Sequence, residues 1–134
     1  MRNGFKLSLL TLALLLTSNL YSAEPEPTPL DIVNRRMQYY NDHRVDAMLE
    51  LYGDDIAIYT YPDKLLGKGK AHLRRTLEEI LADKSVRVTV TQQLTKDSYV
   101  INNESVSYAG KPTQYVSIYE VKGGLIRSVR FVRD

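Results

Sequence analysis

The chain has 134 residues, with 18 Lys and Arg against 16 Asp and Glu, no Cys and ten Tyr. This length allows one domain, and a composition of 43% hydrophobic and 25% charged residues excludes wholesale disorder. Arg2 and Lys6 supply the formal charge of +2 and lie in a leader, so the remaining chain is neutral. A neutral chain lacks the basic surface that binds nucleic acid, and we expect no nucleic-acid partner.

The N-terminus has the three-part pattern of a secretory signal peptide. Arg2 and Lys6 precede the apolar run Leu7–Leu16, and small polar residues follow. The run is about half of the ~20 residues that a transmembrane helix needs. We therefore expect cleavage after Ser22 or Ala23, and a secreted, periplasmic protein without a membrane contact, rather than a retained anchor. Without Cys, such a protein forms no disulfides.

The predicted organisation is a signal peptide (1–23), a Pro-rich spacer (24–29) and one domain (30–134). Alternating prolines in the spacer disfavour helix and sheet. Thr28 is then a helix N-cap, with Pro29 at the first helical position and Asp31 three residues after the cap. The helix is predicted to run to about Asn41, with one apolar side made of Ile32, Val33, Met37 and Tyr40.

Two more helices and a strand follow. Apolar residues at helical spacing predict a second helix from Val45 to Tyr52, which ends at Gly53. β-branched and aromatic residues predict a strand over Ile56–Tyr61, which Pro62 ends. Beyond it we expect a loop (63–69) and a third amphipathic helix (70–82), whose exposed ion pairs are Arg74–Glu78 and Arg75–Glu79.

From Ser85 onward the apolar residues recur at every second position. This period predicts four antiparallel strands, one beginning near Val86 and the others at Tyr99–Tyr108, Gln114–Val121 and Leu125–Val132. Gly123 and Gly124 form the last hairpin turn. Three helices and these strands predict an α+β fold, in which a curved, mainly antiparallel sheet wraps around a helical layer.

Three stretches resemble the nuclear transport factor 2-like superfamily, in particular its SnoaL-like and steroid-isomerase-like branches. They are Asn41–Asp55 with the strand and Pro62 after it, Leu66–Leu73, and Ile118–Ile126. The resemblance covers the chain from Leu30 onward. It implies a cone-shaped, cystatin-like fold, a cavity for a small, largely apolar molecule between sheet and helices, and a homodimer. Some members are isomerases, cyclases, dehydratases or hydrolases, and others only bind.

The catalytic positions of ketosteroid isomerases in this superfamily are not matched. These enzymes use an Asp base before the Pro that ends the first strand, with a Tyr and a protonated Asp as oxyanion hole. The base position falls at Tyr61, whose neutral phenol, with a pKa of about 10, cannot take a carbon-bound proton. The oxyanion Tyr falls near Arg36, and the penultimate strand offers only Glu120 as an acid. The steroid isomerase mechanism is therefore not expected.

Two carboxylates remain as catalytic candidates. Asp63 lies two residues beyond the base position and is a displaced general base or an orienting group for water. The simpler alternative is a turn Asp after Pro. Glu104 lies in mid-strand and shares a face with Asn102, so the two can form a polar floor to the cavity. The alternative, favoured slightly, is a solvent-facing pair on the convex side of the sheet.

Tyrosines are the candidate pocket residues. Tyr59 and Tyr61 share one face of their strand, and the aligned position of Tyr61 suggests that this face lines the cavity. The alternative is ordinary core packing. Tyr40 and Tyr119 are weaker pocket candidates, and the core is the favoured position for each. With two His, no Cys and no metal-binding spacing, we expect neither a metal nor a cofactor.

The sequence therefore predicts an exported domain that binds a small apolar or aromatic molecule and forms a homodimer through the outer face of its sheet. One alternative is an isomerase, hydrolase or dehydratase that uses Asp63 or Glu104 with Tyr59 or Tyr61 for acid–base chemistry. A second alternative is a protein-interaction module with a vestigial cavity.

Overall fold

The computed structural model describes residues 23–133, and the signal peptide predicted for 1–23 therefore lies, apart from Ala23, outside the described residues. The described residues form six strands and three helices, in an α+β fold. In chain order these are α1 (Pro29–Asn41), α2 (Val45–Leu49), β1 (Tyr52–Thr60), β2 (Lys64–Lys68), α3 (Lys70–Leu81), β3 (Arg87–Lys96), β4 (Tyr99–Tyr108), β5 (Lys111–Lys122) and β6 (Leu125–Val132).

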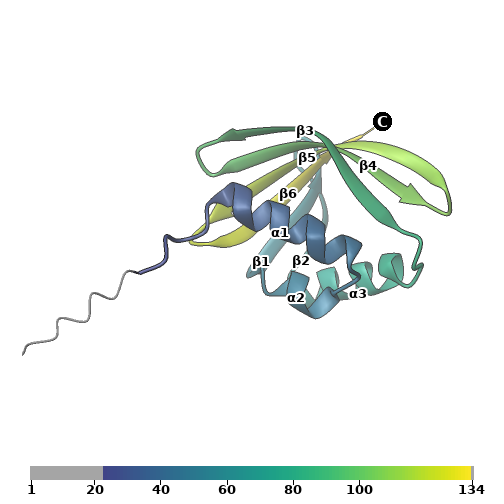
Figure 1. The fold of residues 1–134 in the computed structure, drawn as a ribbon, viewed down its shortest axis with the longest axis horizontal. Helices are drawn as coiled ribbons and strands as arrows, with labels where there is room; N and C mark the ends of the chain where they lie inside the picture. The colour runs from purple at the N-terminus through teal and green to yellow at the C-terminus, as the bar shows by residue number, and fades with distance from the viewer. Residues whose placement is uncertain (1–22, 134) are drawn as a thin grey trace, which may run out of the picture.

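The strands form one curved, mixed sheet in the order β2-β1-β6-β5-β4-β3 (Figure 1). Strands β3 to β6 are consecutive and antiparallel, which confirms the prediction from the period-two pattern. The one parallel pair joins β1 to β6, with Ile58 opposite Val129 and Tyr59 opposite Arg130. The last of these strands thereby lies in the middle of the sheet.

Helix α1 begins with the predicted cap. The hydroxyl of Thr28 accepts a hydrogen bond from the Asp31 backbone N–H (3.2 Å), and the Asp31 carboxylate accepts one from the Thr28 backbone N–H (2.8 Å). The Thr28 side chain, followed by its backbone, lowers the pKa of Asp31, because both donate to the charged carboxylate. The predicted apolar side of the helix is buried, and the helix ends at Asn41 as expected.

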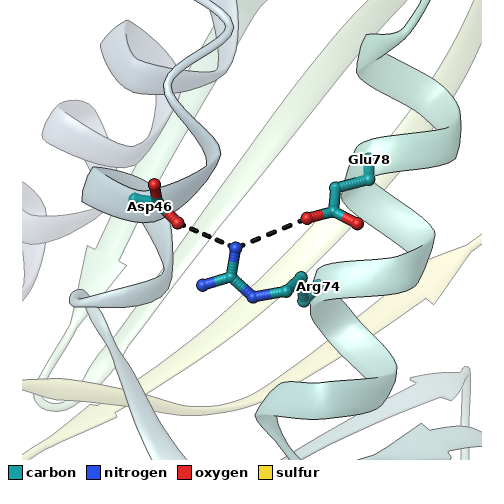
Figure 2. Close-up of polar contacts among 3 residues, drawn as sticks. All are labelled: Asp46, Arg74 and Glu78. Atoms are coloured by element: carbon teal, nitrogen blue, oxygen red, sulfur yellow. Dashed lines mark hydrogen bonds and ion pairs between the residues drawn. The ribbon is translucent and has the colours of Figure 1, made fainter.

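All three helices lie on the concave side of the sheet. Helix α1 crosses β3 to β6, whereas α3 packs against β1 and β2, and α2 joins the two helices (Figure 1). Nη1 of Arg74 on α3 pairs with Asp46 on α2 (2.8 Å) and with Glu78 (3.4 Å), as Figure 2 shows. The Arg74–Glu78 pair was predicted, but within residues 23–133 Arg75 and Glu79 form no ion pair.

Two predictions about the middle of the chain are wrong. The second helix ends at Leu49, and Tyr52 and Gly53 belong to β1, where Tyr52 is buried. Tyr52, three positions after Leu49, fits the apolar spacing of a helix and that of a strand equally well. In the structure it pairs with Ile126 of β6 and therefore belongs to the strand. The predicted loop 63–69 contains β2, which pairs with β1 at the edge of the sheet and is largely exposed.

Candidate functional site

A cavity of about 530 Å³ lies between the concave face of the sheet and helices α1 and α3. This volume and its mainly apolar wall are typical of sites for small organic molecules. The wall contains Arg36, Tyr40, Tyr52, Ile58, Leu66, His72, Leu73, Thr76, Leu77, Ile80, Val88, Glu104, Val106, Tyr108, Thr113, Tyr115, Phe131 and Arg133.

Arg36 is the buried cation of this wall. Arg36 lies on the apolar side of α1 and is 7% exposed. Its Nε donates a hydrogen bond to the Tyr52 hydroxyl (2.7 Å). Its guanidinium lies 5.3 Å from the ring centroids of both Tyr40 and Tyr119. Burial acts to lower the pKa of Arg36. Interactions with Tyr119 and Tyr52, and then with Glu104, outweigh burial and raise that pKa, so the guanidinium is charged.

Glu104 is the buried acidic residue of the same wall and is 3% exposed. Its carboxylate accepts hydrogen bonds from the Tyr119 hydroxyl (2.7 Å), the Ser117 hydroxyl (3.0 Å) and the Asn102 amide (3.2 Å). Burial is the main cause that raises the pKa of Tyr119 well above its usual range, so this tyrosine is a neutral donor. Three donors from β4 and β5 thus hold one carboxylate at the cavity.

Two polar groups of the wall have hydrogen-bonding capacity that the protein leaves unused. Within residues 23–133, neither Nη2 of Arg36 nor the Tyr40 hydroxyl has a hydrogen-bond partner. In the same residues, no fully buried polar side-chain atom lacks a partner. Nη2 of Arg36 and the Tyr40 hydroxyl are therefore not fully buried. Since Arg36 and Tyr40 line the cavity, these two groups are available for hydrogen bonds with a molecule inside it.

Comparison with known proteins identifies the family of this chain. Residues 33–129 match the family described as the SnoaL-like domain, which is more than half of the chain. The chain belongs to this family. A search of curated proteins finds no match.

Solved structures similar to this SnoaL-like domain share its fold. A cystatin fold protein from Novosphingobium aromaticivorans is 21% identical, with 80% of this chain and 99% of that chain covered and a TM-score of 0.75. An NTF2-like protein from Cytophaga hutchinsonii is 15% identical, with 84% and 95% covered and a TM-score of 0.72. The epoxide hydrolase/cyclase-like enzyme SalBIII is 16% identical, with 78% and 88% covered and a TM-score of 0.68.

The structure brings four of the candidate residues of this SnoaL-like domain together. Glu104 and Tyr40 line the cavity, and Asn102 and Tyr119 lie behind the wall, where each donates a hydrogen bond to Glu104. The slightly favoured alternative, a solvent-facing Asn102–Glu104 pair on the convex side, is wrong because both residues are buried on the concave side. The sheet bulge on β3 lets the Gln93 amide donate to Asn102 there (2.8 Å).

The structure places the other three candidates outside the cavity wall, which corrects the expectation from the aligned position of Tyr61. Tyr52 and Ile58 of β1 line the cavity, so odd-numbered residues near the end of the strand point to the outer face. The Tyr59 ring lies 4.5 Å from the Arg130 guanidinium, and Tyr61 is 54% exposed. Asp63 is exposed and forms an ion pair with Arg130 (3.8 Å), as a turn residue would.

Sequence reasoning missed Arg36, Tyr52 and His72 as wall residues. Arg36 lies three positions after Val33 and four before Tyr40, a spacing that places it on the buried side of α1. His72 lines the cavity, and its ring packs so closely on β2 that a Cβ at Gly67 would overlap it.

The described residues also bear on three other features: Glu120, metal ligands and membrane spans. Glu120, the only acid at the third steroid-isomerase position, is absent from the cavity wall and bonds Lys122 (2.7 Å), which lowers the pKa of Glu120. Residues 23–133 contain no group of three or more His, Asp or Glu that could hold a metal ion. None of the helices in this range has the length and hydrophobicity to cross a membrane.

Proposed function

We propose that this SnoaL-like domain binds a small, mainly apolar or aromatic molecule in the cavity between α1, α3 and the sheet. The observation that carries the proposal is a cavity of about 530 Å³ whose wall is aliphatic and aromatic except at a few polar groups. Burial of apolar ligand surface drives binding, and the few polar groups orient the ligand.

The test is a search for a bound molecule. Native mass spectrometry of protein purified from its own host should detect a noncovalent adduct of small-molecule mass. The variant Ile80→Trp fills the cavity, since Ile80 lines it, and should lose the adduct. The matched variant Ala71→Trp, at an exposed position of the same helix outside the cavity wall, should keep it. An adduct-free protein whose melting temperature no aromatic or steroid-like compound raises would count against binding.

A second candidate function is an acid–base enzyme of the isomerase, hydrolase or dehydratase kind. The observation in its favour is that the Glu104 carboxylate lines the cavity beside a charged Arg36. Glu104 would take a proton from the ligand, and Arg36 would stabilise the negative charge that develops. SalBIII, a structural neighbour, acts in pyran ring formation in polyether salinomycin. Asp63 does not support this chemistry here, because it lies outside the cavity wall.

Deuterium exchange separates the two functions. If Glu104 moves protons, a carbonyl ligand in D₂O should exchange its neighbouring C–H protons faster with the wild type than with Glu104→Gln. Equal exchange rates, with unchanged affinity, would leave binding as the function.

We also propose that the protein is a homodimer through the outer face of the sheet. Five residues from neighbouring strands lie opposite one another and form a row across this face: Leu94, Ile101, Ile118, Arg130 and Tyr59. Leu94 is 62% exposed, and Ile101 and Ile118 beside it extend this apolar surface across the sheet. Covering such a row with a second copy would remove apolar surface from water.

Analytical ultracentrifugation tests the dimer. Leu94→Lys should lower the sedimentation coefficient to that of a monomer, whereas Ala71→Lys on α3 should not change it. A wild-type monomer would overturn the proposal and favour an interaction module for another protein.

Export remains a proposal based on residues 1–23. Expression of the full chain in a Gram-negative host should yield a periplasmic product that begins at Ala23 or Glu24. Intact mass measurement distinguishes the two cleavage sites, and a cytoplasmic product that begins at Met1 would contradict export.

A further inference from the structure

The buried polar groups around Arg36, at one part of the cavity wall, offer a ligand mainly donors. Nη2 of Arg36 carries two N–H groups without a partner in residues 23–133, and the Tyr40 hydroxyl is open beside it. Tyr52 accepts from Arg36, which leaves its own hydroxyl proton to donate. Glu104, the acceptor of the group, already receives three hydrogen bonds. A ligand atom that satisfies these donors must be an acceptor, in practice an oxygen.

The charge around that oxygen is balanced. Arg36 contributes one positive charge and Glu104 one negative charge, and both are buried in the same wall. Both contact Tyr119, one through its ring and the other through its hydroxyl. The further charged residue of the wall, Arg133, is exposed and therefore screened by water. The buried part of the cavity thus has no net charge to offer a charged ligand.

We infer that Arg36 and Glu104 together select a ligand whose buried end is an uncharged oxygen acceptor, such as a ketone or ester carbonyl, and reject carboxylates. This inference rests on the proposed binding function. A carboxylate would have to leave water for an apolar cavity, and the repulsion from Glu104 would offset the attraction of Arg36. A neutral carbonyl group has a much smaller desolvation cost than a carboxylate, and a charge-assisted hydrogen bond from Arg36 replaces the hydrogen bond to water that it loses.

Three naphthalenes with the same ring system and different substituents test the inference. They are 2-ethylnaphthalene (apolar), 2-acetylnaphthalene (carbonyl) and 2-naphthoate (carboxylate), titrated into the full chain at pH 7.5 and followed by ligand fluorescence. We expect 2-acetylnaphthalene to bind about tenfold more tightly than either of the other two, the gain of one charge-assisted hydrogen bond.

Two variants assign this preference to Glu104 and to the donors around Arg36. Glu104→Gln removes the negative charge and should raise the affinity for 2-naphthoate about tenfold relative to 2-acetylnaphthalene. Tyr40→Phe should weaken 2-acetylnaphthalene and leave 2-ethylnaphthalene unchanged, because it removes only a hydroxyl. Tyr99→Phe, on the outer face, is the matched control and should leave all three affinities as in the wild type.

The outcomes separate the two proposals. If none of the three compounds binds, the proposed binding function fails. If 2-ethylnaphthalene binds as tightly as 2-acetylnaphthalene, or 2-naphthoate binds most tightly, the binding function stands and the inference is overturned. If Glu104→Gln does not fold, the wild-type order and the Tyr40→Phe result still decide, since neither depends on that variant.

Discussion

Two arginines with carboxylates nearby occupy opposite surroundings in this molecule. Arg36 is 7% exposed beside a Glu104 that is 3% exposed, and neutral tyrosine, serine and asparagine side chains supply the hydrogen bonds around them. The Arg74 side chain is 45% exposed and bonds Asp46 and Glu78 directly, in water (Figure 2). Water can replace every partner of Arg74 but few partners of Arg36. We therefore expect the same kind of substitution to have very different effects at the two places.

The largest effect is expected for Arg36→Leu. Removing the guanidinium leaves the Glu104 carboxylate buried without its positive charge, which should lower the free energy of unfolding by about 3–5 kcal/mol. Urea denaturation followed by circular dichroism measures the change. In the double variant Arg36→Leu/Glu104→Leu no charge is left buried, so its loss should be smaller than the sum of the two single losses. Additive losses would show that the two charges are not coupled.

A smaller effect within the buried cluster is expected for Tyr119→Phe. It removes the 2.7 Å hydrogen bond to the Glu104 carboxylate and should cost about 2 kcal/mol, the usual contribution of a buried hydrogen bond to a charged group. Tyr115→Phe is the control, because the Tyr115 hydroxyl has no hydrogen bond within residues 23–133. Equal denaturation midpoints for the two variants would contradict the role of Tyr119.

The exposed cap of α1 should be weaker again. Thr28→Ala removes the hydroxyl that caps the helix and should cost about 1 kcal/mol at pH 7. Folding lowers the pKa of Asp31, so its contribution is present above the unfolded value and is lost as the pH falls through the folded value. The difference between wild type and Thr28→Ala should therefore shrink below about pH 4. Urea denaturation at pH 7 and pH 3 measures this, and a constant difference would exclude Asp31 from the cap.

The smallest effect is expected for Arg74→Ala, on the surface. Exposed ion pairs contribute little, and salt screens what they contribute. The denaturation midpoint should decrease slightly in low salt and match the wild type in 0.5 M NaCl. A decrease as large as that of Tyr119→Phe would mean that the link between α2 and α3 matters more than its exposure suggests.

Most of the fold followed from the sequence because its periods are clear. The apolar side of α1, the cap at Thr28 and the four last strands were predicted, since each depends on local spacing. The β2 strand was not, because the stretch 64–68 has lysines and a glycine that are typical of a loop. Its strand conformation comes from pairing with β1, a contact between segments that local patterns do not report.

The site was harder to predict because alternation along a strand does not say which side faces inward. Tyr52 and Tyr59 of β1 and Tyr61 just after it are the same residue type, yet of these three only Tyr52 lines the cavity. Arg36 was missed because a charged residue is rarely buried, although its position on α1 gave the signal. Glu104 was singled out as an acid in mid-strand, but the solvent-facing alternative was slightly favoured, because its burial depends on donors from β5 that local alternation does not report.

The parallel pairing of β1 with β6 has a consequence for synthesis. β1 and β2 join the rest of the sheet only through β6, so the sheet stays in two parts until the ribosome has made residues 125–132. The wall of the cavity draws on both parts, with Ile58 from one and Phe131 from the other. A nascent chain that stops at β5 therefore has neither a complete core nor a binding site, and both form only when β6 is added.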